Sequence, residues 1–230
     1  MDEELAKGVT SIGALNTFCS PLQNRASKGS LMELNESIAN DMVNFPRSLL
    51  KACSWNEKIF GVPLEITYLV ILYRKDLLLK YGLRIPGSWD EILESAEYIL
   101  KKEKNTNLKG LSMPKTDFTY SYDRIFFYYL LTKGVKFEKN GQMNIPREES
   151  IRALDELKNI TYSYVNNRDV MYDEFRMESF INGETIFCVD WLGLILSTRM
   201  KIGKNSKDII GIMTLPMAKS VNKRSILCTG

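Results

Sequence analysis

The hydrophobic and polar positions of this chain predict strands and helices in alternation. The clearest strand covers residues 66–73, an apolar run with β-branched and aromatic side chains that is typical of a strand buried on both faces. A short helix is predicted at residues 75–80, and Gly82 stands where helices often end on a glycine. Because strands and helices continue to alternate beyond this point, we expect an α/β fold.

A longer helix is predicted after Ser88, which has capping-box spacing with Glu91. In this motif the Ser88 hydroxyl accepts the Glu91 N–H, and the Glu91 carboxylate accepts the Ser88 N–H. Apolar residues then recur at helical spacing and need a core to face. These residues are Ile92, Leu93, Ala96, Ile99 and Leu100.

The same patterns divide the rest of the chain. We expect strands at residues 10–18, 110–113, 185–189, 209–215 and 225–229, hairpins at 54–60 and 137–145, and helices at 22–26, 36–41, 45–53, 123–132, 148–166 and 173–181. The helix at 148–166 should bury Ile151, Leu154, Tyr162 and Val165. Asp190 and Trp191 should open a further helix that extends to about residue 200.

The composition excludes several classes of protein. The chain has 230 residues, 44% of them hydrophobic, which is enough for a packed core in one large domain or two small ones. Its net charge is +3 with lysines spread along the chain, so we expect no binding to nucleic acid or to an anionic membrane. No apolar run is long enough to cross a membrane, and residues 1–7 are charged, unlike a signal peptide.

The residues that usually carry catalysis are scarce. Histidine is absent, and with it the commonest general base and metal ligand. Cys19, Cys53, Cys188 and Cys228 lack the CxxC spacing of a zinc site and are compatible with two disulfides or four buried thiols. The chain has no glycine-rich phosphate loop. We therefore expect no enzymatic activity, no metal and no cofactor.

Residues 61–100 carry an ordered set of short motifs: Gly-Val-Pro, the apolar strand, Leu-Tyr-Arg-Lys-Asp-Leu-Leu, Tyr-Gly-Leu and Ser-Trp-Asp-Glu. Later come Phe-Ile-Asn-Gly-Glu at 180–184, Asp190-Trp191 and Gly-Ile-Met-Thr-Leu-Pro at 211–216. This order resembles the extracellular solute-binding proteins of sugar ABC transporters, the maltose-binding-protein-like members of the type II periplasmic binding fold. The resemblance extends over residues 10–230.

The resemblance implies a two-lobed protein of which this chain holds a part. Residues 1–64 correspond to a partial lobe 1, residues 65–72 to a crossover strand, residues 73–227 to a nearly complete lobe 2, and residues 228–230 to the start of the return crossover. The chain is then either a fragment or a degenerate gene product. An extracellular or periplasmic location is implied as well.

The function implied by the resemblance is binding of a small solute, in first place a carbohydrate, in a cleft between the lobes. A complete protein would deliver this solute to an ABC permease. Two alternatives stay open. The chain could be the ligand-sensing ectodomain of a receptor, or a remnant that no longer binds a ligand and has an interaction role.

The family's cleft implies ten ligand contacts, because aromatic faces stack on sugar C–H groups while polar side chains bind hydroxyls. They are Asn16 and Thr17 at the end of the first strand, Glu65, Thr67 and Tyr68 on the crossover, Asp117, Tyr120 and Tyr122 before a helix, and Asp190 and Trp191 after a buried strand. Asn16 and Thr17 also fit an ordinary turn, and Tyr68 and Trp191 also fit core packing. We expect Trp55 and Trp89 to be structural.

Overall fold

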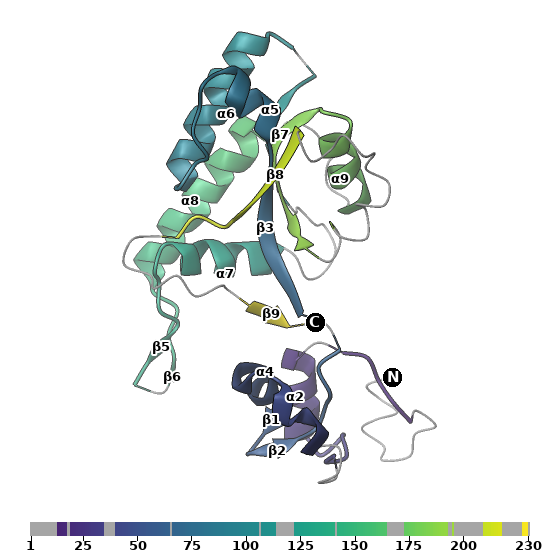
Figure 1. Cartoon of the computed structure of the whole chain (residues 1–230). Coiled ribbons are helices and arrows are strands. Elements are labelled where there is room, and N and C mark those ends of the chain that lie inside the picture. Colours follow the sequence, from purple (N-terminus) through teal and green to yellow (C-terminus); the bar gives the residue numbers. More distant parts are fainter. Residues whose placement is uncertain are drawn as a thin grey trace. The chain divides into compact units, whose positions relative to one another are not determined.

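The structure is a computed structural model, and it forms two compact units (Figure 1). It describes residues 13–17, 19–34, 40–64, 66–105, 107–113, 122–140, 142–164, 173–192, 195, 209–217 and 227–229. Unit 1 comprises residues 1–67 and 227–230, and unit 2 comprises residues 68–226.

Unit 1 contains short helices and one hairpin. Its elements are α2 (Cys19–Ser27), η1 (Met42–Asn44), α4 (Arg47–Ala52), β1 (Ser54–Trp55) and β2 (Lys58–Ile59). The hairpin is antiparallel, and Asn56 and Glu57 at its tip have the positive φ angles that a tight turn requires. A small core joins the helices, and its buried members are Leu22, Ala26, Met42, Leu49 and Cys53.

Unit 2 is built on a sheet whose central strand is β3. The strands are β3 (Ile66–Arg74), β4 (Lys109–Ser112), β7 (Thr185–Trp191) and β8 (Ile210–Thr214), in the order β4-β7-β3-β8. Strand β9 (Leu227–Thr229), whose residues belong to unit 1, pairs with β3, which begins in that unit at Ile66. Strands β7 and β8 are antiparallel to β3, whereas β4 is parallel to β7. Leu69 to Tyr73 of β3 are buried on both faces, as the sequence predicts, because helices pack on both sides of the sheet.

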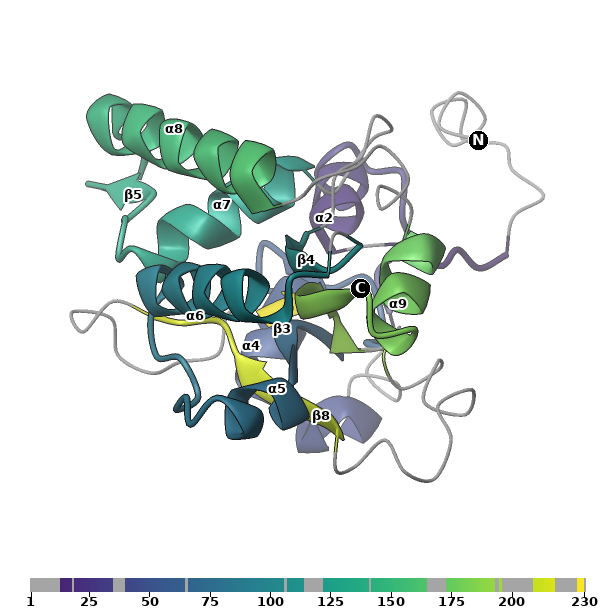
Figure 2. The ribbon, with the colours of Figure 1, turned by 90° about the horizontal axis from the view of Figure 1, so that it is seen from above.

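Helices cover the two faces of this sheet (Figures 1 and 2). They are α5 (Lys75–Lys80), α6 (Trp89–Glu103), α7 (Tyr122–Thr132), α8 (Arg147–Tyr164) and α9 (Asp173–Ile181), and a small hairpin of β5 (Glu138–Lys139) and β6 (Gln142–Met143) follows α7. Helices α6, α7 and α8 lie on one side and α9 on the other. Under α9, Met177 and Phe180 pack with Val70, Leu72 and Cys188 of the sheet.

The predicted capping box is only half correct. The Ser88 hydroxyl accepts the Glu91 N–H at 3.1 Å, as expected. The Glu91 carboxylate, however, accepts the N–H of Gly87 at 2.7 Å rather than that of Ser88. Arg84 binds the other oxygen of the same carboxylate, and this second contact fixes the side chain over Gly87.

The predicted buried stripe of α8 is wrong where it can be tested. Ile151 is 48% exposed and Leu154 is 44% exposed, whereas Ser150, Ala153 and Leu157 are buried. The buried face is therefore rotated by one residue, about 100° around the helix axis. Small side chains at Ser150 and Ala153 let α8 approach its neighbours closely. The side chains of Tyr162 and Val165 lie outside the described part of the chain.

Two other predictions differ from the structure. Residues 13–17 are not a strand, and no described strand pairs with them. Trp191 ends β7 instead of opening a helix, and the helical residue that follows it is Leu192. The predicted helix at 36–41 falls mostly outside the described residues. The hairpins and the helices at α2, α5, α7 and α9 are confirmed.

Candidate functional site

Three strands of unit 2 meet at the end of the sheet where Tyr68 lies. Leu69 of β3 pairs with Trp191 of β7, and Val70 pairs with Thr214 of β8. Since both neighbours are antiparallel to β3, the start of β3 lies beside the ends of β7 and β8. The register therefore brings Tyr68, Asp190 and Trp191, which are distant in sequence, to one end of the sheet.

Asp190 and Trp191 face opposite sides of the sheet. Successive side chains of a strand alternate between its faces. Asp190 pairs with Val70, whose side chain belongs to the cluster under α9, whereas the Trp191 ring contacts Tyr128 of α7 on the other side. The two residues were predicted as a pair, but the structure gives them different surroundings.

Trp191 is held by an aromatic neighbour. Its ring centroid lies 5.9 Å from that of Tyr128, at an interplanar angle of 72°, which is an edge-to-face contact. Tyr128 is buried, whereas Trp191 is partly exposed. The indole is therefore fixed on one side and open in part on another, as a stacking surface for a ligand requires. Sequence reasoning missed Tyr128, because it lies within the unbroken aromatic run at 126–129.

Asp190 is fully buried, and its Oδ1 accepts the backbone N–H of Trp191 at 2.8 Å. A carboxylate in this position fixes the backbone at the end of β7. Tyr68 is partly buried and packs against the cluster of Val70, Leu72, Met177 and Phe180. It lies two residues before Val70, the cross-strand partner of Asp190, so Tyr68 and Asp190 share one face of the sheet.

The other predicted contacts lie elsewhere. Asn16 is exposed in unit 1, and the Thr17 hydroxyl accepts a hydrogen bond from Arg25 at 2.8 Å. Thr67 lies on β3, and Tyr122 begins α7. Glu65, Asp117 and Tyr120 fall outside the described residues.

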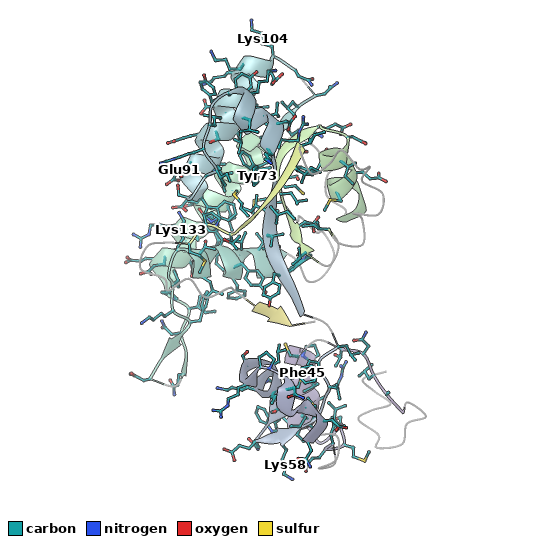
Figure 3. The ribbon with its side chains drawn as sticks, viewed as in Figure 1. Phe45, Lys58, Tyr73, Glu91, Lys104 and Lys133 are labelled. Atoms are coloured by element: carbon teal, nitrogen blue, oxygen red, sulfur yellow. The ribbon has the colours of Figure 1, made fainter. Side chains whose placement is uncertain are left out.

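A polar network joins the helices on the Trp191 side of the sheet. Trp89 of α6 donates its indole N–H to Thr132 of α7 at 3.1 Å, and the Thr132 hydroxyl donates to the Tyr129 carbonyl. The Tyr129 hydroxyl donates to Glu156 of α8, which also pairs with Lys133 at 2.8 Å. Lys133, directly after α7, is labelled in Figure 3. Three helices are thus held together next to Tyr128, the neighbour of Trp191.

The charges of this network shift two pKa values. Burial raises the pKa of Tyr129, and the adjacent Glu156 carboxylate raises it further, so the phenol stays protonated. Partial burial acts to raise the pKa of Glu156, but the hydrogen bonds from Lys133 and Tyr129 outweigh it and hold that pKa below its ordinary value. Glu156 therefore stays ionised at neutral pH.

No set of three or more acidic, cysteine or histidine side chains suited to a metal occurs among the described residues. Within the same residues, no helix combines the length and apolar character needed to span a membrane.

Residues 19–190, more than half of the chain, match the family described as bacterial extracellular solute-binding protein. The chain belongs to this family. The resemblance drawn from the motifs at 61–100 and beyond is thereby confirmed.

The similar proteins agree with this assignment. "Putative ABC transporter periplasmic-binding protein YcjN" of Escherichia coli K12 is 26% identical over 125 residues, which are 54% of this chain and 28% of that protein. Maltose-bound MalE3 of T. maritima is 23% identical with a TM-score of 0.72, over 86% of this chain and 51% of its own. An Agrobacterium radiobacter K84 ABC transporter solute-binding protein in complex with ribitol is 18% identical with a TM-score of 0.79, over 97% of this chain and 57% of its own.

These structures establish the fold of the chain. It is the α/β type II periplasmic-binding-protein-like fold, as the sequence resemblance implied. The chain spans about half the length of the solved structures that it matches. The receptor-ectodomain and remnant alternatives are not favoured by these matches.

Proposed function

We propose that the protein binds a small polyhydroxylated solute, a carbohydrate or a sugar alcohol, for delivery to an ABC transporter. The family supports solute binding, and two similar structures are described with maltose and with ribitol. An extracellular or periplasmic location, an ABC permease as partner and a binding rather than catalytic role belong to the same proposal. The division into a partial lobe 1 at residues 1–64, a crossover strand and a lobe 2 at residues 73–227 belongs to it as well.

The observation that carries the proposal is the partly exposed indole of Trp191 held edge-to-face by Tyr128. A fixed aromatic face suits the C–H groups of a sugar or polyol. Because the ring is already held in place, no entropy is lost in ordering it when the ligand binds, and the affinity for the ligand is higher. In our proposal Trp191 stacks on the ligand, Tyr128 orients the Trp191 ring, and Asp190 fixes the backbone at Trp191. Tyr68, on the other face, supplies a hydroxyl near the same sheet end.

The remaining predicted contacts belong to the same proposal. These are Asn16, Thr17, Glu65, Thr67, Asp117, Tyr120 and Tyr122. Each can be tested by alanine substitution once a ligand is known.

The test is calorimetric titration of the whole chain with maltose and with ribitol, with a mixture of amino acids as the comparison. Trp191→Ala should weaken binding at least tenfold, or about 1.4 kcal/mol. Trp55→Ala is the matched control, because Trp55 is 40% exposed on a hairpin of unit 1 and should leave the affinity unchanged. If the Trp191→Ala protein bound the ligand as tightly as wild type does, Trp191 would not be a ligand contact. Tighter binding of amino acids than of maltose and ribitol would contradict the proposed class of ligand.

A further inference from the structure

Two cysteines of unit 1 lie on elements that contact each other. Cys19 is the first residue of α2, and Cys53 is the C-cap of α4. Gln23 of α2 connects these elements, because its Nε2 lies 3.3 Å from the carbonyl oxygens of both Ala52 and Ser54. These two carbonyls flank Cys53 in the sequence, so the middle of α2 lies against the segment that carries this thiol.

Cys19 precedes Gln23 by one helical turn. Residues four apart lie on the same face of a helix, with their Cβ atoms about 5–6 Å apart. Cys19 therefore faces the same end of α4 as Gln23 does. Burial raises the pKa of the Cys53 thiol, and the Cys19 thiol raises it further, in keeping with the contact between α2 and the segment of Cys53.

We propose that Cys19 and Cys53 form a disulfide bond when the folded protein meets a disulfide oxidant such as glutathione disulfide. Both residues carry thiols in this structure. The bond would join α2 to α4 within unit 1. One bond between these two residues, with Cys188 left as a thiol, differs from both patterns considered from the cysteine count, two disulfides or four buried thiols.

The two thiols differ in access, which sets the order of the exchange. Cys53 is 8% exposed, whereas Cys19 is less deeply buried. The Cys19 thiolate attacks glutathione disulfide, forms a mixed disulfide and releases one glutathione thiolate, which takes up a proton. The Cys53 thiolate then attacks the sulfur of Cys19 and releases the second glutathione. Two protein thiols are oxidised, and one glutathione disulfide is reduced to two glutathione molecules.

The oxidised protein should resist unfolding better than the reduced protein. The bond closes the chain between positions 19 and 53, and a closed loop of this size lowers the entropy of the unfolded chain. We expect a higher melting temperature after oxidation, and dithiothreitol should reverse the change. In an oxidising compartment outside the cytoplasm such a bond would persist.

The experiment is oxidation of the whole folded chain by glutathione disulfide, alkylation of the remaining thiols and tryptic mapping without reduction. The four cysteines fall on four separate tryptic peptides, residues 8–25, 52–58, 177–199 and 225–230. The expected product is a linked pair of peptides 8–25 and 52–58 that loses the mass of two hydrogen atoms. Cys188 is fully buried on β7, so peptide 177–199 should remain alkylatable only after unfolding and serves as the internal control.

Single variants test the order of reaction. Cys53→Ser should accumulate glutathione on peptide 8–25, and Cys19→Ser should leave peptide 52–58 largely without glutathione. Either variant should lose the oxidation-dependent rise in melting temperature.

The proposal is overturned if both thiols of the wild-type chain are still alkylated after equilibration with glutathione disulfide. It is also overturned if Cys53 is linked to Cys188 or Cys228 instead. Because the wild-type map needs no substitution, a variant that fails to fold leaves the result intact.

Discussion

Gly211 of β8 lies directly opposite Tyr73 of β3, and the tyrosine ring occupies the space that a side chain at Gly211 would need. A Cβ atom added to Gly211 would lie 2.0 Å from Cζ of Tyr73. Tyr73 is itself buried, so the ring has little room to move. The pair holds an edge strand to the centre of the sheet.

Gly211→Ala should therefore destabilise unit 2 by about 1–3 kcal/mol, the usual cost of forcing atoms into a packed site. Gly87→Ala is the control, because a Cβ there would meet only Glu91 at the ordinary distance of 3.6 Å. Urea denaturation of both variants measures the difference. A second variant, Gly211→Ala with Tyr73→Val, should recover part of the loss, and absence of recovery would show that the ring is not the cause.

Gly183→Ala should cost more stability than Gly82→Ala. Both glycines follow helices with positive φ angles, +78° and +64°, so both substitutions carry backbone strain of about 1 kcal/mol. Only at Gly183 would the new Cβ also lie 2.8 Å from Nη1 of Arg74. Arg74 is fixed there, because it donates to the Gly183 carbonyl and pairs with Asp76. Equal melting temperatures for the two variants would contradict this account.

The Glu156 network predicts a dependence of stability on pH. The pKa of Glu156 is lower in the folded protein than in the unfolded chain. The ionised carboxylate therefore adds to the free energy of unfolding above about pH 4.3, and this stabilisation is lost as the pH falls through the pKa of the folded protein. The free energy of unfolding should therefore differ between wild type and Glu156→Gln by a constant amount near neutral pH, and by less below about pH 4. Urea titrations from neutral to acidic pH measure this difference. If the difference in the free energy of unfolding between the two proteins grew as the pH fell, the pKa of Glu156 would be raised, not lowered, by folding.

Tyr129→Phe tests the same network from the phenol side. It removes the hydroxyl that donates to Glu156, and we expect a loss of about 1 kcal/mol of stability at neutral pH. Tyr98→Phe is the control, since Tyr98 is 44% exposed on α6. Thermal unfolding compares the two proteins. If Tyr129→Phe were as stable as Tyr98→Phe, the hydrogen bond from Tyr129 to Glu156 would make no net contribution to stability.

Except for the strand expected at 10–18 and the helix expected to open at Asp190, the sequence was sufficient for the type and order of the elements that the structure describes, because these depend on local signals. The apolar run of β3, the turn at Asn56 and the glycine after α9 each act within a few residues. Details that depend on distant partners were predicted less well. Glu91 turns to Gly87 because Arg84 holds its carboxylate, and the spacing of Ser88 and Glu91 alone does not contain that contact.

The candidate site shows the same limit. Trp191 could be proposed from its place after a buried strand, but its partner Tyr128 comes from α7, more than sixty positions earlier in the chain. The opposite facing of Asp190 and Trp191 follows once β7 is known to include both, because side chains of a strand alternate. The sequence pattern ended the strand at Val189 and predicted that both residues open a helix, so it did not indicate that they face opposite sides of the sheet.

The rotated face of α8 gives the last prediction. Leu157 is 2% exposed and Leu154 is 44% exposed, although the sequence favoured Leu154 for the core. Leu157→Ala should cost about 2–4 kcal/mol, because it removes buried methyl groups and leaves a cavity. Leu154→Ala should change stability by less than about 0.5 kcal/mol, as exposed substitutions usually do. The two variants remove the same atoms from one helix, so chemical denaturation compares burial alone. If Leu154→Ala were the costlier change, α8 would present the face that the sequence pattern predicted.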